Sequence, residues 1–387
     1  MSNDTVELVA QCLCKTHTFK ATVPASFLPL SVTTCHCNSC RHATGALYLS
    51  DADWPNQNED ISALEVYDFS PNLQEFFCKS CGTRMFCKDR KPGSKLGVIT
   101  GTLQNAPNLV RYDNHIFVGD TRDGGATMYL RKSHPDAKPA RRFSKHTDSE
   151  EYPEDWPSNF DLPDPEAKAS PELTPLYCHC RGVNLLLKSA TDLEGREKLP
   201  FYVNPGSFKY LGSFDACDSC RISFGADITT WTFAALDHIG FPATQHPGTT
   251  PETFEPIAKT TFDLKAAVAS ETKDSRLGTL EFYQSSPDVE RYFCSKCAAS
   301  VFYAVHNRPS IVDIGVGLLD HPSGARAEGL IHWSYGSVGR TEDVEGSWRE
   351  HLARCVKEDA EKWRLQRGYP KSARRIQVES GDTTMHM

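Results

Sequence analysis

The 387-residue sequence has no long hydrophobic run. A membrane-spanning helix needs about 18 consecutive apolar residues, and no stretch approaches that length. Residues 1–10 are acidic rather than basic followed by apolar, which is unlike a secretion signal. We therefore expect a soluble, unsecreted protein that is cytoplasmic, with a nuclear location left open, and that does not contact a membrane.

The sequence also lacks an excess of basic residues. It has 42 Lys and Arg against 50 Asp and Glu, which gives a formal net charge of −8. Nine acidic residues and one lysine fall within residues 146–172, so the remainder is near neutral. Proteins that bind nucleic acid need a basic face to neutralise phosphates. We therefore expect no nucleic-acid partner.

Cysteine, in contrast, is abundant, with fifteen residues in the chain. Outside an oxidising compartment, closely spaced cysteines are more often metal ligands or catalytic groups than disulfides. The hydrophobic content of 39% is typical of a globular protein. Metal binding is therefore the leading interpretation of the cysteines.

Several motifs occur twice in the same order, which indicates a duplication. The first copy has Leu64 followed by Phe77-Cys78-Lys79-Ser80-Cys81. The second copy has Leu280, followed at the same distance along the chain by Phe293-Cys294-Ser295-Lys296-Cys297. Cys12-Leu13-Cys14 is echoed by Cys178-His179-Cys180, and Cys37-Asn38-Ser39-Cys40-Arg41 by Cys217-Asp218-Ser219-Cys220-Arg221. The second copy is longer, and residues 240–256 are rich in Pro, Thr and Gly, as in a surface loop.

These repeats predict four segments. They are a first domain at residues 1–145, a linker at 146–172, a second domain at 173–345 and a C-terminal helix with a polar tail at 346–387. The linker is acidic and contains five prolines, so we expect it to be extended and non-helical. Trp156 and Phe160 could instead dock on a domain.

Within each repeat the pattern is mainly β. Short β-branched or aromatic segments are separated by Gly, Pro and Asn, as at Phe19–Val23, Leu96–Thr100, His115–Val118 and Ser300–Val305. The exception is Trp348–Arg367, where apolar residues at helical spacing predict an amphipathic helix. We expect this helix to pack on the protein rather than on a membrane.

The cysteines of the first repeat divide into four plus three. Zinc takes about four ligands, and two residues with one or two residues between them on a turn can share an ion. The two pairs Cys12/Cys14 and Cys78/Cys81 would form a closed, structural site. The triplet Cys35, Cys37 and Cys40 would leave one position open for water or substrate, as in catalytic sites.

The second repeat keeps the closed set and loses one thiol of the triplet. Cys178, Cys180, Cys294 and Cys297 predict a second structural zinc. Asp215 stands where the first repeat has Cys35, which leaves Asp215, Cys217 and Cys220 as a mixed ligand set. We therefore expect three zinc ions per chain, and a fourth only if Asp215 is a ligand.

Two further kinds of residue lie outside these ligand sets. Cys87 and Cys355 have no partner at ligand spacing and are interpreted as packing residues. His115 and His332 recur 34 and 35 positions after Cys81 and Cys297. This recurrence predicts equivalent positions, either structural or lining the active cleft.

Together these motifs resemble the glutathione-dependent formaldehyde-activating enzyme family, which also includes centromere protein V. The resemblance covers about residues 7–135 well and 174–340 more loosely. It implies two tandem Mss4-like zinc-binding β domains. It also implies a structural zinc on Cys12, Cys14, Cys78 and Cys81 and a catalytic zinc on Cys35, Cys37 and Cys40. In the second repeat, Asp215 and Cys297-Ala298-Ala299 depart from the pattern.

The resemblance implies a carbon–sulfur lyase. Such an enzyme joins a small thiol such as glutathione to formaldehyde or a related aldehyde, and zinc can lower the pKa of the thiol or polarise the aldehyde. A rival hypothesis is a non-catalytic, zinc-stabilised module that binds a protein. The intact triplet favours the enzyme, while Asp215 favours a binding role for the second half.

Overall fold

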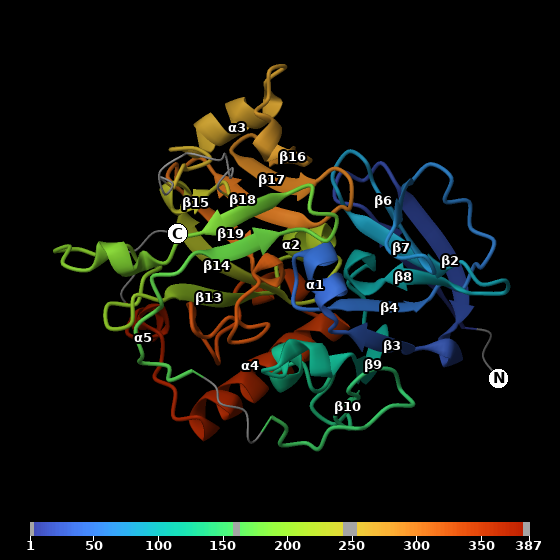
Figure 1. The fold of residues 1–387 in the computed structure, drawn as a ribbon. Helices are drawn as coiled ribbons and strands as arrows, with labels where there is room; N and C mark the ends of the chain where they lie inside the picture. The colour runs from blue at the N-terminus through green and yellow to red at the C-terminus, as the bar shows by residue number, and fades with distance from the viewer. Residues whose placement is uncertain (1–3, 158–162, 243–253, 382–387) are drawn as a thin grey trace.

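The computed structural model describes residues 4–157, 163–242 and 254–381. It is mainly β, as the sequence predicts, and the two halves of the chain lie side by side (Figure 1). The first half contains an eight-stranded sheet and a separate hairpin. The hairpin strands are β1 (Thr5–Gln11) and β2 (Thr18–Pro24). The sheet strands, in spatial order, are β10 (Arg141–Arg142), β9 (Val110–Ile116), β3 (Leu30–Cys35), β4 (Leu49–Asp53), β8 (Leu96–Ile99), β7 (Arg84–Asp89), β6 (Leu73–Phe77) and β5 (Glu65–Asp68).

Over its described residues, the second half has the same strand order, without a counterpart of β10. Its seven-stranded sheet runs β20 (Ile331–Trp333), β13 (Tyr210–Asp215), β14 (Thr229–Ala235), β19 (Ile311–Gly315), β18 (Ser300–Val305), β17 (Val289–Cys294) and β16 (Leu280–Ser286). A smaller sheet contains β11 (Thr174–Tyr177), β12 (Asn184–Leu187) and β15 (Ile239–Gly240). In both large sheets a parallel pair lies near one end, β3 with β9 and β13 with β20. The shared order supports the duplication.

Five α-helices complete the described chain. They are α1 (Asn38–Thr44), α2 (Asp218–Phe224), α3 (Thr261–Ala269), α4 (Trp348–Gln366) and α5 (Ala373–Glu379). None of them is long and apolar enough to cross a membrane. The sequence analysis did not predict α3, although Thr260 forms a capping box with Asp263 at its start.

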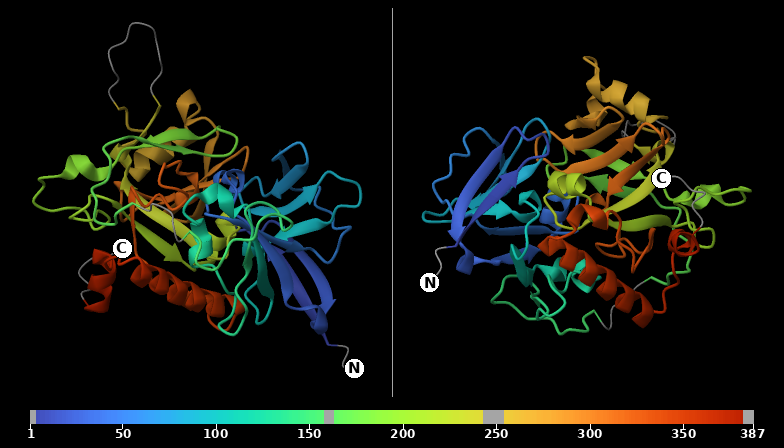
Figure 2. Two further views of the ribbon diagram at one scale, coloured as in Figure 1. Left: turned by 60° about the horizontal axis from the view of Figure 1, so that its bottom comes forward. Right: turned by 180° about the vertical axis from the view of Figure 1, so that it is seen from behind.

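The predicted C-terminal helix is confirmed. α4 extends beneath both halves of the chain (Figures 1 and 2). Its helically spaced residues Trp348, Leu352, Val356 and Trp363 are all buried. The helix therefore packs on the protein with its apolar face, as expected.

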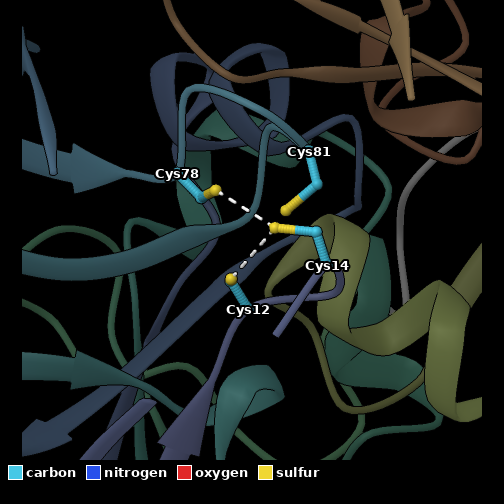
Figure 3. A group of neighbouring side chains, drawn as sticks. All are labelled: Cys12, Cys14, Cys78 and Cys81. Atoms are coloured by element: carbon cyan, nitrogen blue, oxygen red, sulfur yellow. Dashed lines mark hydrogen bonds between the residues drawn. The ribbon is translucent and has the colours of Figure 1, made fainter. Parts of the chain in front are cut away.

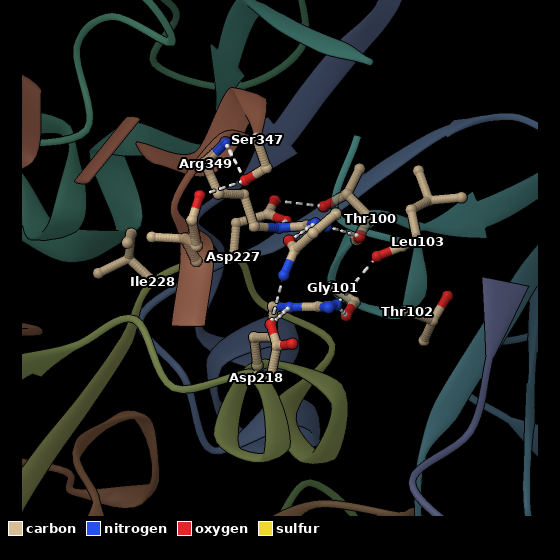
Figure 4. Close-up of polar contacts among 12 residues, drawn as sticks. Thr100, Gly101, Thr102, Leu103, Asp218, Asp227, Ile228, Ser347 and Arg349 are labelled. Carbon is tan, nitrogen blue, oxygen red and sulfur yellow. Dashed lines mark hydrogen bonds and ion pairs between the residues drawn. The ribbon is translucent and has the colours of Figure 1, made fainter. Parts of the chain in front are cut away.

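α4 is joined to both halves through a buried ion pair. Arg349 donates from Nε to the Asp227 carboxylate at 2.8 Å, and from Nη2 to the Thr100 carbonyl at 2.7 Å (Figure 4). The same carboxylate accepts hydrogen bonds of 2.6 Å from Thr100 Oγ1 and Tyr112 Oη. Asp227 belongs to the second half and Thr100 to the first. This cluster therefore connects three segments that are far apart in the sequence.

The two halves share one continuous hydrophobic core. Their contact is reciprocal, because Gly101 packs on Gly225 and Ala226 while Gly317 packs on Gly45 and Ala46. The Tyr48 hydroxyl bonds to both the amide and the carbonyl of Ile228, which is its counterpart in the second repeat. The hydrophobic core therefore shows no boundary between the two predicted domains. The division of the chain into domains stays a prediction.

The glycine contacts provide a test of this packing. A Cβ on Gly101 would overlap the backbone of Gly225 and Ala226. We expect Gly101→Ala to lower the free energy of unfolding by about 1–3 kcal/mol, as overpacking does, measured by denaturant titration. Gly206→Ala is the matched control, since the nearest atom to its Cβ would be 3.5 Å away. Equal stability of the two variants would contradict the close approach.

Residues 146–157 of the acidic segment are not extended, which corrects one expectation. Residues 146–157 fold back on the first half, where Tyr152 donates to the Arg142 carbonyl and Ser144 to that of Glu150. Glu151 and Glu154 pair with Arg141 and Arg131, so neighbouring cations offset the expected repulsion. Trp156 stacks on Tyr152 with ring centroids 4.0 Å apart. Phe160 lies outside the described residues, and no helix forms in 146–157 or 163–172.

The predicted strands are mostly confirmed. The segments at Phe19–Val23, Leu96–Thr100 and Ser300–Val305 correspond to β2, β8 and β18. The expected strand at His115–Val118 is only partly right, because β9 ends at Ile116 and a 3-10 turn begins at Val118. Of the loop predicted at residues 240–256, positions 243–253 lie outside the described residues.

Candidate metal centres

Two four-cysteine clusters form where pairs of strands turn. Cys12 and Cys14 follow β1, while Cys78 and Cys81 lie between β6 and β7. Their Sγ atoms lie within 4.8 Å of one another (Figure 3). The second cluster, on the corresponding strands of the second half, contains Cys178, Cys180, Cys294 and Cys297. The structure therefore brings together both sets that the sequence predicts as closed sites.

The spacing of the sulfurs fits a tetrahedral ion. Cys14 Sγ lies 3.5 Å from Cys12 Sγ and 3.6 Å from Cys78 Sγ. Cys180 Sγ lies 3.6 Å from Cys178 Sγ and 3.5 Å from Cys294 Sγ. Thiolates about 2.3 Å from a zinc ion lie about 3.8 Å apart in a tetrahedron. Both clusters can thus hold a metal ion, and all eight thiols are free of disulfides.

Backbone amides support these thiols. His17 donates its N–H to Cys12 Sγ at 3.3 Å, and Val183 donates to Cys178 Sγ at the same distance. Hydrogen bonds of this kind orient the sulfurs and stabilise negative charge on them. The turns are therefore built for thiolates rather than for apolar packing.

The triplet of the first half lies at a strand-to-helix junction. Cys35 ends β3, Cys37 caps the N-terminus of α1, and Cys40 lies in its first turn. Their Sγ atoms lie within 4.8 Å of one another. Cys35 and Cys37 are half-buried and Cys40 is buried. The three predicted ligands thus converge, and two of them can be approached from solvent.

One thiol of the triplet is prepared to carry negative charge. Hydrogen bonds from Cys35 and Cys40 lower the pKa of the Cys37 thiol to about 3. The Cys40 amide also donates to Cys37 Sγ at 3.2 Å. The same hydrogen bonding, joined by burial, raises the pKa of Cys40 well above its usual value. The site therefore holds at least one thiolate at neutral pH.

A protein-family comparison covers this part of the chain. The model described as glutathione-dependent formaldehyde-activating enzyme matches residues 7–120. This stretch of the first half is therefore similar to that family. The matched range contains the closed cluster and the triplet of the first half. No curated protein matches the chain.

Two buried histidines lie next to the triplet. His36 Nε2 is 2.9 Å from His115 Nδ1, and both rings are fully buried. Burial lowers the pKa of His115 to about 3 and that of His36 well below its usual value. Both rings are therefore neutral at pH 7 and support the site from behind. His36 was not expected from the sequence, although it lies between two triplet cysteines.

The predicted equivalence of His115 and His332 is wrong. His115 pairs with Thr34, directly before Cys35, whereas His332 pairs with Leu211, four residues before Asp215. The two histidines therefore occupy different registers of their sheets. Equal spacing along the chain did not imply equal positions, because the connections to β9 and β20 differ.

The second half does not reproduce the triplet. Within the described residues, Asp215, Cys217 and Cys220 are not among the groups whose ligand atoms converge within 4.8 Å. Asp215 accepts a hydrogen bond from the Cys217 amide at 2.9 Å. Arg291, on β17, places Nη1 3.6 Å from Cys220 Sγ. The sequence analysis missed Arg291, although the repeats align it with Glu75.

The two isolated cysteines are buried. Cys87 packs beside the triplet with Cys40, Leu49 and Ile99. Cys355 lies on the buried face of α4. Neither belongs to a converging group among the described residues. Their predicted packing role agrees with these positions.

Proposed function

We propose that the first domain is a zinc-dependent carbon–sulfur lyase. It would join a low-molecular-weight thiol such as glutathione to formaldehyde or a related aldehyde. The observation that carries the proposal is the convergence of three thiols, two of them half-buried, in the stretch that is similar to this family. A closed four-thiol cluster would have no position for a reactant.

The donor set at Cys35, Cys37 and Cys40 suits zinc. Three soft thiolates are typical zinc ligands and leave one coordination position free. When bound, zinc would lower the pKa of a thiol or polarise an aldehyde oxygen. The two closed clusters, each with four thiols, would hold structural zinc.

The residues of the chain determine how reactants approach. Cys40 is 6% exposed, so entry is from the side of Cys35 and Cys37. Phe69 and Leu73 pack beside the triplet and give this side an apolar wall. Such a wall excludes water and strengthens the charge interactions of the thiolates. The neutral pair His36 and His115 closes the other side.

The reaction forms one bond and moves one proton. The thiol sulfur attacks the carbonyl carbon of the aldehyde, the carbon–oxygen double bond becomes single, and the oxygen receives a proton. The product is a hydroxyalkyl thioether, and the reverse reaction breaks the carbon–sulfur bond. The enzyme class is therefore a carbon–sulfur lyase.

Replacing Cys37 tests the proposal. We expect Cys37→Ser to keep the fold, because both closed clusters remain, and to weaken metal binding at the triplet. Lyase activity should fall by about tenfold or more, the range seen when metal sites lose support. The measurement is the initial rate with glutathione and formaldehyde, after circular dichroism has confirmed folding.

Cys355→Ser is the matched control, since this buried cysteine lies on α4, outside the converging groups. It should retain the wild-type rate. An unchanged rate in folded Cys37→Ser would contradict the assignment of the triplet and favour a non-catalytic module.

A further inference from the structure

Three differences between the repeats fall at one place in the second half. Asp215 replaces Cys35, Arg291 replaces Glu75 and Tyr303 replaces Cys87. Arg291 and Tyr303 are direct cross-strand partners on β17 and β18, as Glu75 and Cys87 are on β6 and β7. Asp215 bonds to the Cys217 amide, Arg291 lies next to Cys220, and Tyr303 stacks on Arg291. The changes are therefore concerted rather than scattered.

Arg291 brings a permanent positive charge to this place. Its side chain is 8% exposed, and its guanidinium carbon lies 5.0 Å from the centre of the Tyr303 ring. Its Nη1 is 3.6 Å from Cys220 Sγ. In the first half the aligned Glu75 is instead neutralised by Arg84. A cation so close to the sulfur repels a metal ion and takes over its role as the counter-charge of a thiolate.

The two cysteines differ in accessibility. Cys217 is half-buried, while Cys220 is buried against Arg291. Cys217 is the N-cap of α2 and Cys220 lies in the first turn of this helix, so both thiols lie at the same end of the helix. An accessible thiol followed by a buried one, with two residues between them, is an arrangement that suits thiol–disulfide exchange.

We propose that Cys217 and Cys220 form a metal-free dithiol that exchanges with low-molecular-weight disulfides. The Cys217 thiolate attacks one sulfur of the small disulfide, forms a mixed disulfide and releases one thiolate. Cys220 then attacks the Cys217 sulfur, closes the intramolecular disulfide and releases the second thiolate. The dithiol loses two electrons and the small disulfide gains them. Arg291 stabilises the negative charge on Cys220 before this second attack and when the bond reopens.

Intact-mass spectrometry with oxidised glutathione as the probe tests this proposal. The wild-type chain should form one Cys217–Cys220 disulfide, located by peptide mapping, without losing zinc. Cys220→Ser should stop at a glutathione adduct on Cys217, because the resolving thiol is missing. Cys217→Ser should form neither product at this place. Adducts on the zinc-cluster cysteines would be recognised by their peptides and by zinc release.

Metal analysis provides the second measurement. The wild-type chain should contain three zinc ions, none of them at Cys217 and Cys220. Asp215→Cys/Arg291→Gln, which restores three thiols and removes the cation, should bind one additional zinc and lose the disulfide exchange. A fourth zinc in the wild-type chain that protects Cys217 and Cys220 from alkylation would overturn the proposal. The absence of an adduct in folded Cys220→Ser would overturn it as well, whatever the lyase activity of the first half.

Discussion

Cys78→Ser is expected to lose the metal of its closed cluster and to unfold the chain near room temperature. Metal binding in small zinc domains contributes on the order of 10 kcal/mol to folding. That is comparable with the whole stability of a typical protein, about 5–15 kcal/mol. Cys78 is completely buried, and its Sγ lies 3.6 Å from that of Cys14. Zinc content and thermal unfolding of the full-length chain are the measurements.

Because the two halves share a core, the loss should spread to the second half. We expect Cys294→Ser to behave in the same way from the other side. Cys355→Ser serves as the control: it also changes a buried cysteine, but should retain all zinc and lose no more than about 2 kcal/mol. A Cys78→Ser chain with wild-type zinc content and melting temperature would show that the cluster is not a structural metal site.

Arg349→Leu should cause the second-largest loss of stability. The substitution leaves the Asp227 carboxylate fully buried with only its two hydroxyl donors, Thr100 and Tyr112. Breaking a buried ion pair from one side typically costs about 3–5 kcal/mol, because the remaining charge is uncompensated. The free energy of unfolding would be measured by denaturant titration, with tryptophan fluorescence as the signal, since Trp348 lies next to the substituted residue.

Arg354→Leu is the matched control on the same helix. Arg354 is exposed, so its loss should change the free energy of unfolding by less than about 0.5 kcal/mol. The double variant Asp227→Asn/Arg349→Leu should recover part of the loss, because it removes both charges. Equal stabilities of Arg349→Leu and Arg354→Leu would mean that α4 is not anchored by this ion pair.

Much of the metal chemistry could be predicted from the sequence because it is local. Cysteines with one or two residues between them lie on the same turn, and their repetition in the same order shows which pairs correspond. α4 was equally visible, because Trp348, Leu352 and Val356 repeat at helical spacing. In these cases the information lies within a few neighbouring residues.

Contacts between distant segments were not visible in the same way. Nothing local to Arg349 indicates that its partner is Asp227, and His332 matched His115 in spacing but not in strand register. Arg291 was a different kind of omission. An alignment of the repeats over β6 and β17 matches Arg291 with Glu75. This match shows that a negative residue in the first half corresponds to a positive one in the second.

The reciprocal glycine contacts have a consequence for the order in which the chain folds. The surface around Gly45 and Gly101 is covered only after the ribosome has synthesised the chain through Gly225 and Gly317. At about 5–20 residues per second, the roughly 200 residues from Ile116 to Gly317 take roughly 10–40 s to synthesise. During that time the nascent first half exposes the surface that will later pack on the second half. That interval is when a chaperone, or the first half of a neighbouring nascent chain, has the opportunity to bind there.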